Sequence, residues 1–421
     1  MNIIKIRGDL MRSFEEKVSD YAKLVVEIGI NVQPNEPLVI TAPVEGVEFV
    51  RELAKFAYAK KASEVFVNWN DDVLTRLKYE NAPMEVFEEF PNWRADMMEY
   101  YAKKGAGFIS IHADDPNLLK GIDTEKIAAA NKSSSVGLKE FRKYTMNDIN
   151  SWCVISIPTL NWAKSLFPDL SSKEAVEKLW DAIFKATRVD LDDPVAAWKD
   201  HLESLERRMN YLNEKKFKTL HYTSSNGTDL TVSLPKNHIW AGGGGKNSKG
   251  VYFVANMPTE EVFTMPHKYG VDGVVYSSKP LNYSGNLIED FKLVFENGKV
   301  VDFDAREGKS ILEEMLNMDE GARRLGEVAL VPYSSPIQKA GILFKNTLFD
   351  ENASCHFALG KAYPTNIENG VNMSEKELDE NGVNDSLIHV DFMVGTSDLS
   401  IVGKTDDGEE YIIFKNGEWN I

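Results

Sequence analysis

The first half of the chain alternates between short apolar runs and amphipathic helical segments, and this alternation strongly limits the folds available to it. Strand-like runs occupy residues 37–43, 63–69, 107–113 and 152–158. Helical patterns precede or separate them at 13–29, 47–62, 95–105 and 124–144, and two more follow at 171–186 and 194–215. Alternating strands and helices are typical of a parallel sheet covered by helices. We therefore predict an α/β fold that begins with a parallel α/β sheet domain.

The sequence changes character near Lys216, after which strands dominate. Alternating apolar runs flank Asn-Gly pairs at 226–227, 297–298 and 416–417, and this dipeptide is typical of tight hairpin turns. One helix pair is expected at 310–326. We predict two domains, an N-terminal α/β domain at residues 13–214 and a strand-rich α/β domain at residues 215–421.

Composition excludes several classes of protein. The chain has 421 residues, 43% of them hydrophobic, with a net charge of −17 and a pI near 5.0. Nucleic-acid binding requires a basic face, so this balance argues against it and against an anionic membrane surface. No window is apolar enough to span a membrane, and the first residues lack the apolar region of a secretory signal. Two distant cysteines, Cys153 and Cys355, give no disulfide framework and fit a reducing cytoplasm.

An apolar strand near the C-terminus, residues 388–394, carries an imidazole and a carboxylate on one face. Ile388, Val390 and Phe392 alternate with His389 and Asp391. Residues two apart on a strand project to the same side, so both polar groups reach one point above the sheet. A buried carboxylate needs compensation, and a metal ion is one candidate for it.

Other polar residues accompany apolar strands elsewhere in the second half. Each has an ordinary explanation when taken alone, because glutamates usually face solvent and a single histidine is usually a hydrogen-bonded core residue. Taken together, carboxylates and imidazoles converging from several strands would form a hydrolase-type metal site. Two divalent ions would require five or six ligands, with one carboxylate bridging them. The further candidates are Glu260, Glu261, Glu327, Glu351 and His356.

A run of glycines at 242–245 suggests a phosphate-binding loop but does not match the dinucleotide template. Asn247 stands where the last glycine of G-x-G-x-x-G belongs. We predict a flexible loop beside a site or an interface. The sequence also lacks the H-E-x-x-H and G-x-S-x-G signatures.

Several separated motifs, in order along the chain, resemble the thermophilic aminopeptidases, the M29 metallopeptidase family. They are "NMPTEEVFT", "GARRLGEVALVP", "LFDENASCHFALGKAYP" and "IHVDFMVG", and "YAKLVVEIGINVQP" and "WNDD" in the first half are also similar. The resemblance extends over nearly the whole chain after about residue 13.

The resemblance implies a metal-dependent aminopeptidase that releases N-terminal amino acids from peptides through a water activated by two metals. It makes residues 215–421 the metal-binding catalytic domain and implies two divalent ions (Zn, Co, Mn or Mg). The implied ligands are Glu261, Glu327, Glu351, His356, His389 and Asp391, and Tyr363 would stabilise the tetrahedral intermediate. The family also implies a homodimer, and the substrate would be a peptide with a free N-terminus.

Two questions stay open at this point. The sequence does not identify the carboxylate that acts as general base, and Glu260 is the candidate that we name. A non-catalytic metal- or peptide-binding protein on the same fold is the alternative, and a dinucleotide enzyme is disfavoured because G-x-G-x-x-G is missing.

Overall fold

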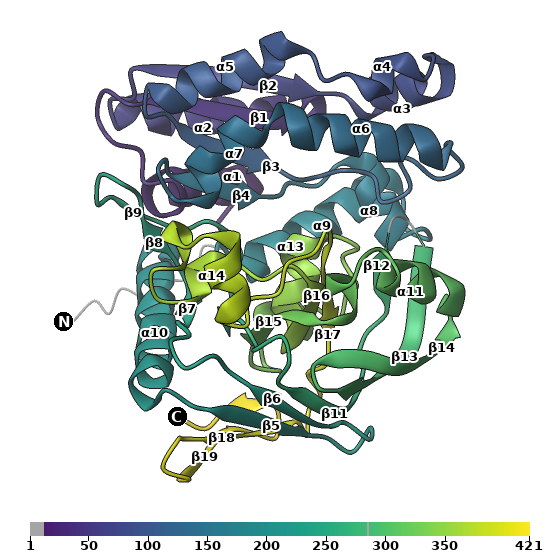
Figure 1. Ribbon diagram of the computed structural model, residues 1–421. Coiled ribbons are helices and arrows are strands. Elements are labelled where there is room, and N and C mark those ends of the chain that lie inside the picture. Colours follow the sequence, from purple (N-terminus) through teal and green to yellow (C-terminus); the bar gives the residue numbers. More distant parts are fainter. Residues whose placement is uncertain (1–11, 284–285) are drawn as a thin grey trace, which may run out of the picture.

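The computed structural model describes residues 12–283 and 286–421, so the prediction about a leader segment falls mostly outside the described residues. Figure 1 shows the first half of the chain as a helix-covered sheet that lies above the strand-rich second half, with α10 running beside the latter. The fold class is confirmed: a parallel α/β sheet is followed by antiparallel, strand-rich sheets. Among the described residues, no helix is long and apolar enough to cross a membrane.

The first sheet has four parallel strands in the order β2-β1-β3-β4. All four lie where the apolar runs predict them: β1 (Pro37–Pro43), β2 (Glu64–Asn70), β3 (Gly107–Ile111) and β4 (Trp152–Ile155). The helices of this half are α1 (Phe14–Leu24), α2 (Val47–Ala59), α3 (Asp72–Asn81), α4 (Glu85–Glu88), α5 (Asn92–Lys103), α6 (Thr124–Gly137), α7 (Lys139–Met146), α8 (Leu160–Leu166), α9 (Ser172–Ala186) and α10 (Pro194–Lys215).

A large antiparallel sheet forms the base of the second half. Its strands run in the order β12-β13-β11-β6-β5-β18-β19-β20, and β14 pairs with β13. Their bounds are β5 (Thr219–Thr223), β6 (Asp229–Ser233), β11 (Val271–Tyr276), β12 (Leu281–Tyr283), β13 (Asn286–Glu296), β14 (Lys299–Glu307), β18 (Ser400–Lys404), β19 (Glu410–Lys415) and β20 (Glu418–Trp419). The three Asn-Gly pairs connect β5 to β6, β13 to β14 and β19 to β20, as the sequence predicts.

A five-stranded sheet, in the order β17-β16-β15-β10-β7, packs by one face on the large antiparallel sheet. Val328, Phe357 and Phe392 lie in one row across it and are buried in the same core cluster as Tyr222 of the large sheet. The ring of Phe357 is 5.0 Å from that of Tyr222. The strands are β7 (Ala241–Gly242), β10 (Val262–Thr264), β15 (Leu325–Leu330), β16 (His356–Gly360) and β17 (His389–Met393).

The structure corrects two expectations for the second half. The glycine run is a loop only in part, because Gly242 ends β7 and Gly245 begins β8 (Gly245–Lys246), which pairs with β9 (Tyr252–Phe253), while residues 243–244 belong to no strand. A side chain at Gly242 would meet the carbonyl oxygen of Glu261 at 2.6 Å, so the close pairing of β7 with β10 requires glycine. The prediction of a helix pair at 310–326 is also wrong, because α11 (Lys309–Leu316) is followed by a 3₁₀ turn and not by a second helix. At this turn the Asp319 carboxylate accepts the N–H of Ala322.

Short helices of the second half lie outside its sheets, and those within residues 336–353 pack against the core of the first half. They are α12 (Pro336–Ala340), α13 (Thr347–Asp350), the 3₁₀ turn η4 (Glu351–Ala353) and α14 (Glu375–Glu380). The indole of Trp162 on α8 donates to the carbonyl of Phe344 at 2.7 Å, and Phe344 and Phe349 belong to the core cluster of the first half. The segment that leads to Glu351 is therefore anchored by the other half of the chain. The division into domains at residue 214/215 stays a prediction.

Candidate metal centre

The second face of the five-stranded sheet carries the polar residues that the sequence singles out. Glu327 on β15, Ala358 on β16 and Asp391 on β17 lie directly opposite one another, so their side chains share a face. His356 and His389 lie on the same face, since each is two residues from a member of this row. The small side chain of Ala358 leaves the space above β16 to the longer side chains of Glu327 and Asp391.

Two groups of three residues converge there, and they share one carboxylate. Glu261, Glu327 and His356 form the first group, and Glu327, His389 and Asp391 form the second; within each group the ligand atoms lie within 4.8 Å of one another. Oε1 of Glu327 is 3.5 Å from Nε2 of His356, and its Oε2 is 3.7 Å from Nε2 of His389. The two oxygens of one glutamate thus face two different imidazoles.

Each histidine presents the same nitrogen to the carboxylates. Nδ1 of His356 donates to the carbonyl of Ser354 at 3.2 Å, and Nδ1 of His389 donates to the carbonyl of Lys361 at 2.7 Å. Nε2 of His356 then lies 3.3 Å from Glu261, and Nε2 of His389 lies 3.4 Å from Asp391. In both histidines one ring nitrogen donates to a backbone carbonyl and the other faces carboxylates. Metal-ligating histidines are typically arranged in this way.

The pKa shifts of the buried carboxylates and histidines show that negative charge is unfavourable in this centre. Burial raises the pKa of Glu327, and the nearby Asp391 and Glu261 add to that rise. Burial also raises the pKa of Glu351 well above its ordinary value, with Glu261 and Asp391 acting in the same direction. Burial alone would lower the pKa of His389, but its contact with Asp391 outweighs this and raises it to about 9. The cluster favours added positive charge.

One ligand atom lacks the partner that a buried oxygen normally has. Oδ1 of Asp391 is buried and accepts no hydrogen bond from the described residues, although Nε2 of His389 is near it. Most buried polar atoms in proteins are paired, so such an atom calls for an ion or a water molecule. With the two imidazole Nε2 atoms and Glu327 between them, the donor set fits divalent metal ions that accept mixed nitrogen and oxygen ligands.

The remaining predicted site residues lie around this centre. Glu351 begins η4, and the carboxylates of the centre act on it electrostatically. The ring of Tyr363 lies 4.8 Å from that of His389. Burial raises the pKa of the Tyr363 hydroxyl, and the nearby Glu327 carboxylate raises it further. Glu260 differs, because both of its oxygens accept hydrogen bonds from Arg188, at 2.6 and 2.9 Å.

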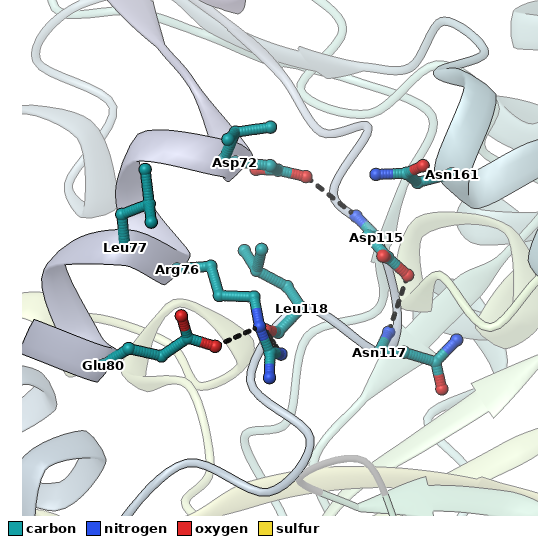
Figure 2. Close-up of a pocket in the computed structure, with 9 residues that line it drawn as sticks. Asp72, Arg76, Leu77, Glu80, Asp115, Asn117, Leu118 and Asn161 are labelled. Carbon is teal, nitrogen blue, oxygen red and sulfur yellow. Dashed lines mark hydrogen bonds and ion pairs between the residues drawn. The ribbon is translucent and has the colours of Figure 1, made fainter.

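Figure 2 shows a separate cavity of about 190 Å³ in the first half of the chain. It lies beyond the carboxyl ends of the parallel strands, where α/β sheets often bind ligands. The Asp72 carboxylate accepts the N–H of Asp115, and Arg76 pairs with Glu80. None of the predicted site residues lines this cavity, and its carboxylates are already satisfied, by backbone N–H groups for Asp72 and Asp115 and by Arg76 for Glu80.

Sequence reasoning missed two residues beside this centre, Asn352, which contacts Glu351, and Arg188, which binds Glu260. The amide of Asn352 lies between Glu351 and the backbone of Glu260, and Arg188 is distant in the chain from the residue it pairs with. Neither belongs to a metal-ligand residue type. Their only sequence signal is the adjacency of Asn352 to Glu351.

Comparisons with known proteins identify the family of the chain. The family model of the thermophilic metalloproteases (M29) matches residues 14–419. The chain is 52% identical to Aminopeptidase 2 of Geobacillus stearothermophilus, over 97% of the chain and 99% of that protein. It is 44% identical to Aminopeptidase PepS of Streptococcus thermophilus, over 98% and 100%. The solved structure of wild-type AmpT from Thermus thermophilus superposes with a TM-score of 0.92 at 38% identity, covering 97% of this chain and all of that one.

Proposed function

Because the chain belongs to the M29 family of thermophilic metalloproteases, we propose that it is an aminopeptidase that releases N-terminal amino acids from peptides with two divalent metal ions. The observation that carries the proposal is the position of Glu327 between two histidines, one facing each of its oxygens. The proposed ligands are Glu261, Glu327, Glu351, His356, His389 and Asp391.

Charge supports two ions rather than one. The four carboxylates of the set carry a formal charge of −4 when ionised, and the imidazoles are neutral when they act as ligands. Two divalent ions would balance this charge in a site from which water is largely excluded, since Glu327 and His356 are 6% and 1% exposed. Zn, Co, Mn and Mg all remain candidates.

Two divalent ions in such a site supply an activated water molecule and polarise the scissile carbonyl. The residues of the chain complete the chemistry. Tyr363 keeps its proton at neutral pH, because burial and the carboxylates raise its pKa, and its hydroxyl can therefore donate a hydrogen bond to the developing oxyanion.

A carboxylate must take a proton from the water and return it to the leaving amine nitrogen. Glu260 is the candidate from the sequence, but both of its oxygens accept hydrogen bonds from Arg188, which holds them away from the metal centre. Glu351 suits this role better, because its carboxylate lies beside the centre and burial raises its pKa, which makes it the stronger base. We therefore propose Glu351 as the proton carrier, in addition to or in place of a ligand role.

The test is hydrolysis of an amino-acyl nitroanilide and of a free peptide by the purified protein. Exhaustive chelation should abolish both reactions, and added Co²⁺ or Zn²⁺ should restore them. The same peptide with an acetylated N-terminus should resist cleavage. Full activity in a protein that elemental analysis finds free of metal would refute the proposal, and internal cleavage of the acetylated peptide would make the protein an endopeptidase.

A metal- or peptide-binding protein without turnover is the alternative, and failure of hydrolysis in a protein loaded with two ions would favour it. The homodimer and the cytoplasmic location that the resemblance implies stay predictions.

A further inference from the structure

Glu261 occupies a segment without regular hydrogen bonding. It lies immediately before β10, and residues 259–261 belong to no helix or strand. By contrast, the other close ligands Glu327, His356, His389 and Asp391 lie on paired strands. The paired strand begins only at Val262, so contacts from other segments help to hold Glu261 at its distance of 3.3 Å from His356.

We propose that Asn352 and Arg188 are positioning residues that fix Glu261 in the metal centre by holding the adjacent Glu260 from two sides. This inference rests on the proposed metal centre and adds to it two residues that contact no substrate.

Asn352 holds the backbone. Its side chain is fully buried, and its Oδ1 accepts the N–H of Glu260 at 2.7 Å. Its Nδ2 donates to the carbonyl of Leu348 at 3.0 Å and lies 3.4 Å from Oε1 of Glu351. One planar amide thus connects the peptide that precedes Glu260 to the carboxylate of Glu351, so it sets the spacing between the Glu260–Glu261 segment and Glu351.

Arg188 holds the side chain. Its guanidinium donates to both oxygens of Glu260, which is 4% exposed, at 2.6 and 2.9 Å. Such bidentate pairs fix orientation as well as distance. Arg188 also donates to Nδ1 of His201 at 3.0 Å, and Nε2 of His201 donates to the carbonyl of Thr259 at 2.8 Å. The residues on either side of the peptide bond that precedes Glu260 are therefore held by one connected network.

The consequence follows from alternation along the chain. Glu260 points to Arg188 while Glu261 points to His356, so the twin glutamates project in different directions. Because Arg188 fixes the side chain of Glu260, Glu260 is kept out of the metal centre and Glu261 is oriented toward it. Residues that orient metal ligands typically contribute about 10- to 100-fold to metal affinity or activity.

The test compares metal binding by Asn352→Ala with binding by a matched control, Asn150→Ala. Asn150 is also buried, and its amide donates to two backbone carbonyls, those of Ala102 and Ala106. Both variants lose buried hydrogen bonds, but only Asn352 contacts the centre. Dissociation constants for Co²⁺ are measured by competition with a chelator, and the Co²⁺ absorption spectrum reports the ligand geometry. Asn352→Ala should bind at least one ion about 10- to 100-fold more weakly with an altered spectrum, whereas Asn150→Ala should match the wild type.

A second pair of variants covers the case in which Asn352→Ala does not fold. Arg188→Lys keeps the charge but loses the bidentate geometry. Arg208→Lys is its control, because Arg208 also acts electrostatically on Glu260 but packs over the ring of Trp419, 5.1 Å away. Arg188→Lys should weaken Co²⁺ binding, and excess metal should recover its turnover; Arg208→Lys should do neither.

Unchanged Co²⁺ constants and spectra in both Asn352→Ala and Arg188→Lys would overturn the inference, and if Asn352→Ala does not fold, unchanged values in Arg188→Lys alone would do so. The wild-type measurement separates this failure from that of the proposed function. A wild type that binds two ions but hydrolyses no peptide would refute the activity and leave the positioning claim intact.

Discussion

Replacement of Glu327 by glutamine removes the carboxylate that the two halves of the metal centre share. Oε1 lies 3.5 Å from His356 and Oε2 lies 3.7 Å from His389, so a positive charge held beside either imidazole lies about this far from the carboxylate. At an effective dielectric constant of about 20, two unit charges 3.5 Å apart interact by about 5 kcal/mol. Since 1.4 kcal/mol corresponds to a factor of about ten and each ion carries two charges rather than one, each ion should bind at least roughly a thousandfold more weakly.

The expected stoichiometries distinguish this glutamate from the residues that serve only one group. After identical dialysis, elemental analysis should find Glu327→Gln depleted of both ions. His356→Ala and His389→Ala should each lose one ion preferentially, because each histidine belongs to a single group. Retention of two ions by Glu327→Gln, with wild-type turnover, would refute the shared-ligand geometry.

Further predictions concern individual residues of the centre and its ionisation. His389→Ala and Asp391→Asn should each lower kcat by several orders of magnitude while the fold survives, because the opposite face of β17 keeps its packing; circular dichroism and turnover check this, and wild-type kcat in both would make the pair structural. Glu261→Gln should lose far more metal than Glu260→Gln, by elemental analysis, and the reverse order would exchange their roles. Metal-free protein should lose stability between pH 7 and 10, whereas metal-loaded protein should not. In the metal-free protein the pKa of His389 is raised to about 9. The stabilisation that results is complete below the unfolded-state pKa near 6.5 and is lost as pH rises through 9. The raised pKa of Glu351 acts in the same direction. The free energy of unfolding is measured in urea for chelated and for metal-loaded protein at pH 7 and at pH 10. A stability difference between the two forms that is no larger at pH 10 than at pH 7 would contradict this prediction.

Local patterns in the sequence were sufficient to predict much of the architecture. The four apolar runs of the first half match β1 to β4, and Asn-Gly pairs mark three hairpins, because turn chemistry and periodicity act over a few residues. The alternation in residues 388–394 likewise predicts that His389 and Asp391 share a face, since a strand has a period of two.

The parts that could not be predicted depend on contacts between distant segments. Glycines 242–245 read as a loop because nothing local shows that Gly242 must approach the backbone of Glu261. Helix α3 was missed because it has no buried residue and so no clear apolar stripe. The pairing of Glu260 with Arg188 spans 72 residues, so nothing local in the sequence shows that Glu260 is held away from the metal centre.

The most direct measurement of the central claim is anomalous diffraction from crystals loaded with Co²⁺ or Zn²⁺. We predict two peaks roughly 3.5–4 Å apart, one on each side of the Glu327 carboxylate and next to His356 and His389 respectively. A single peak, or peaks away from Glu327, would contradict the account that two ions share this residue.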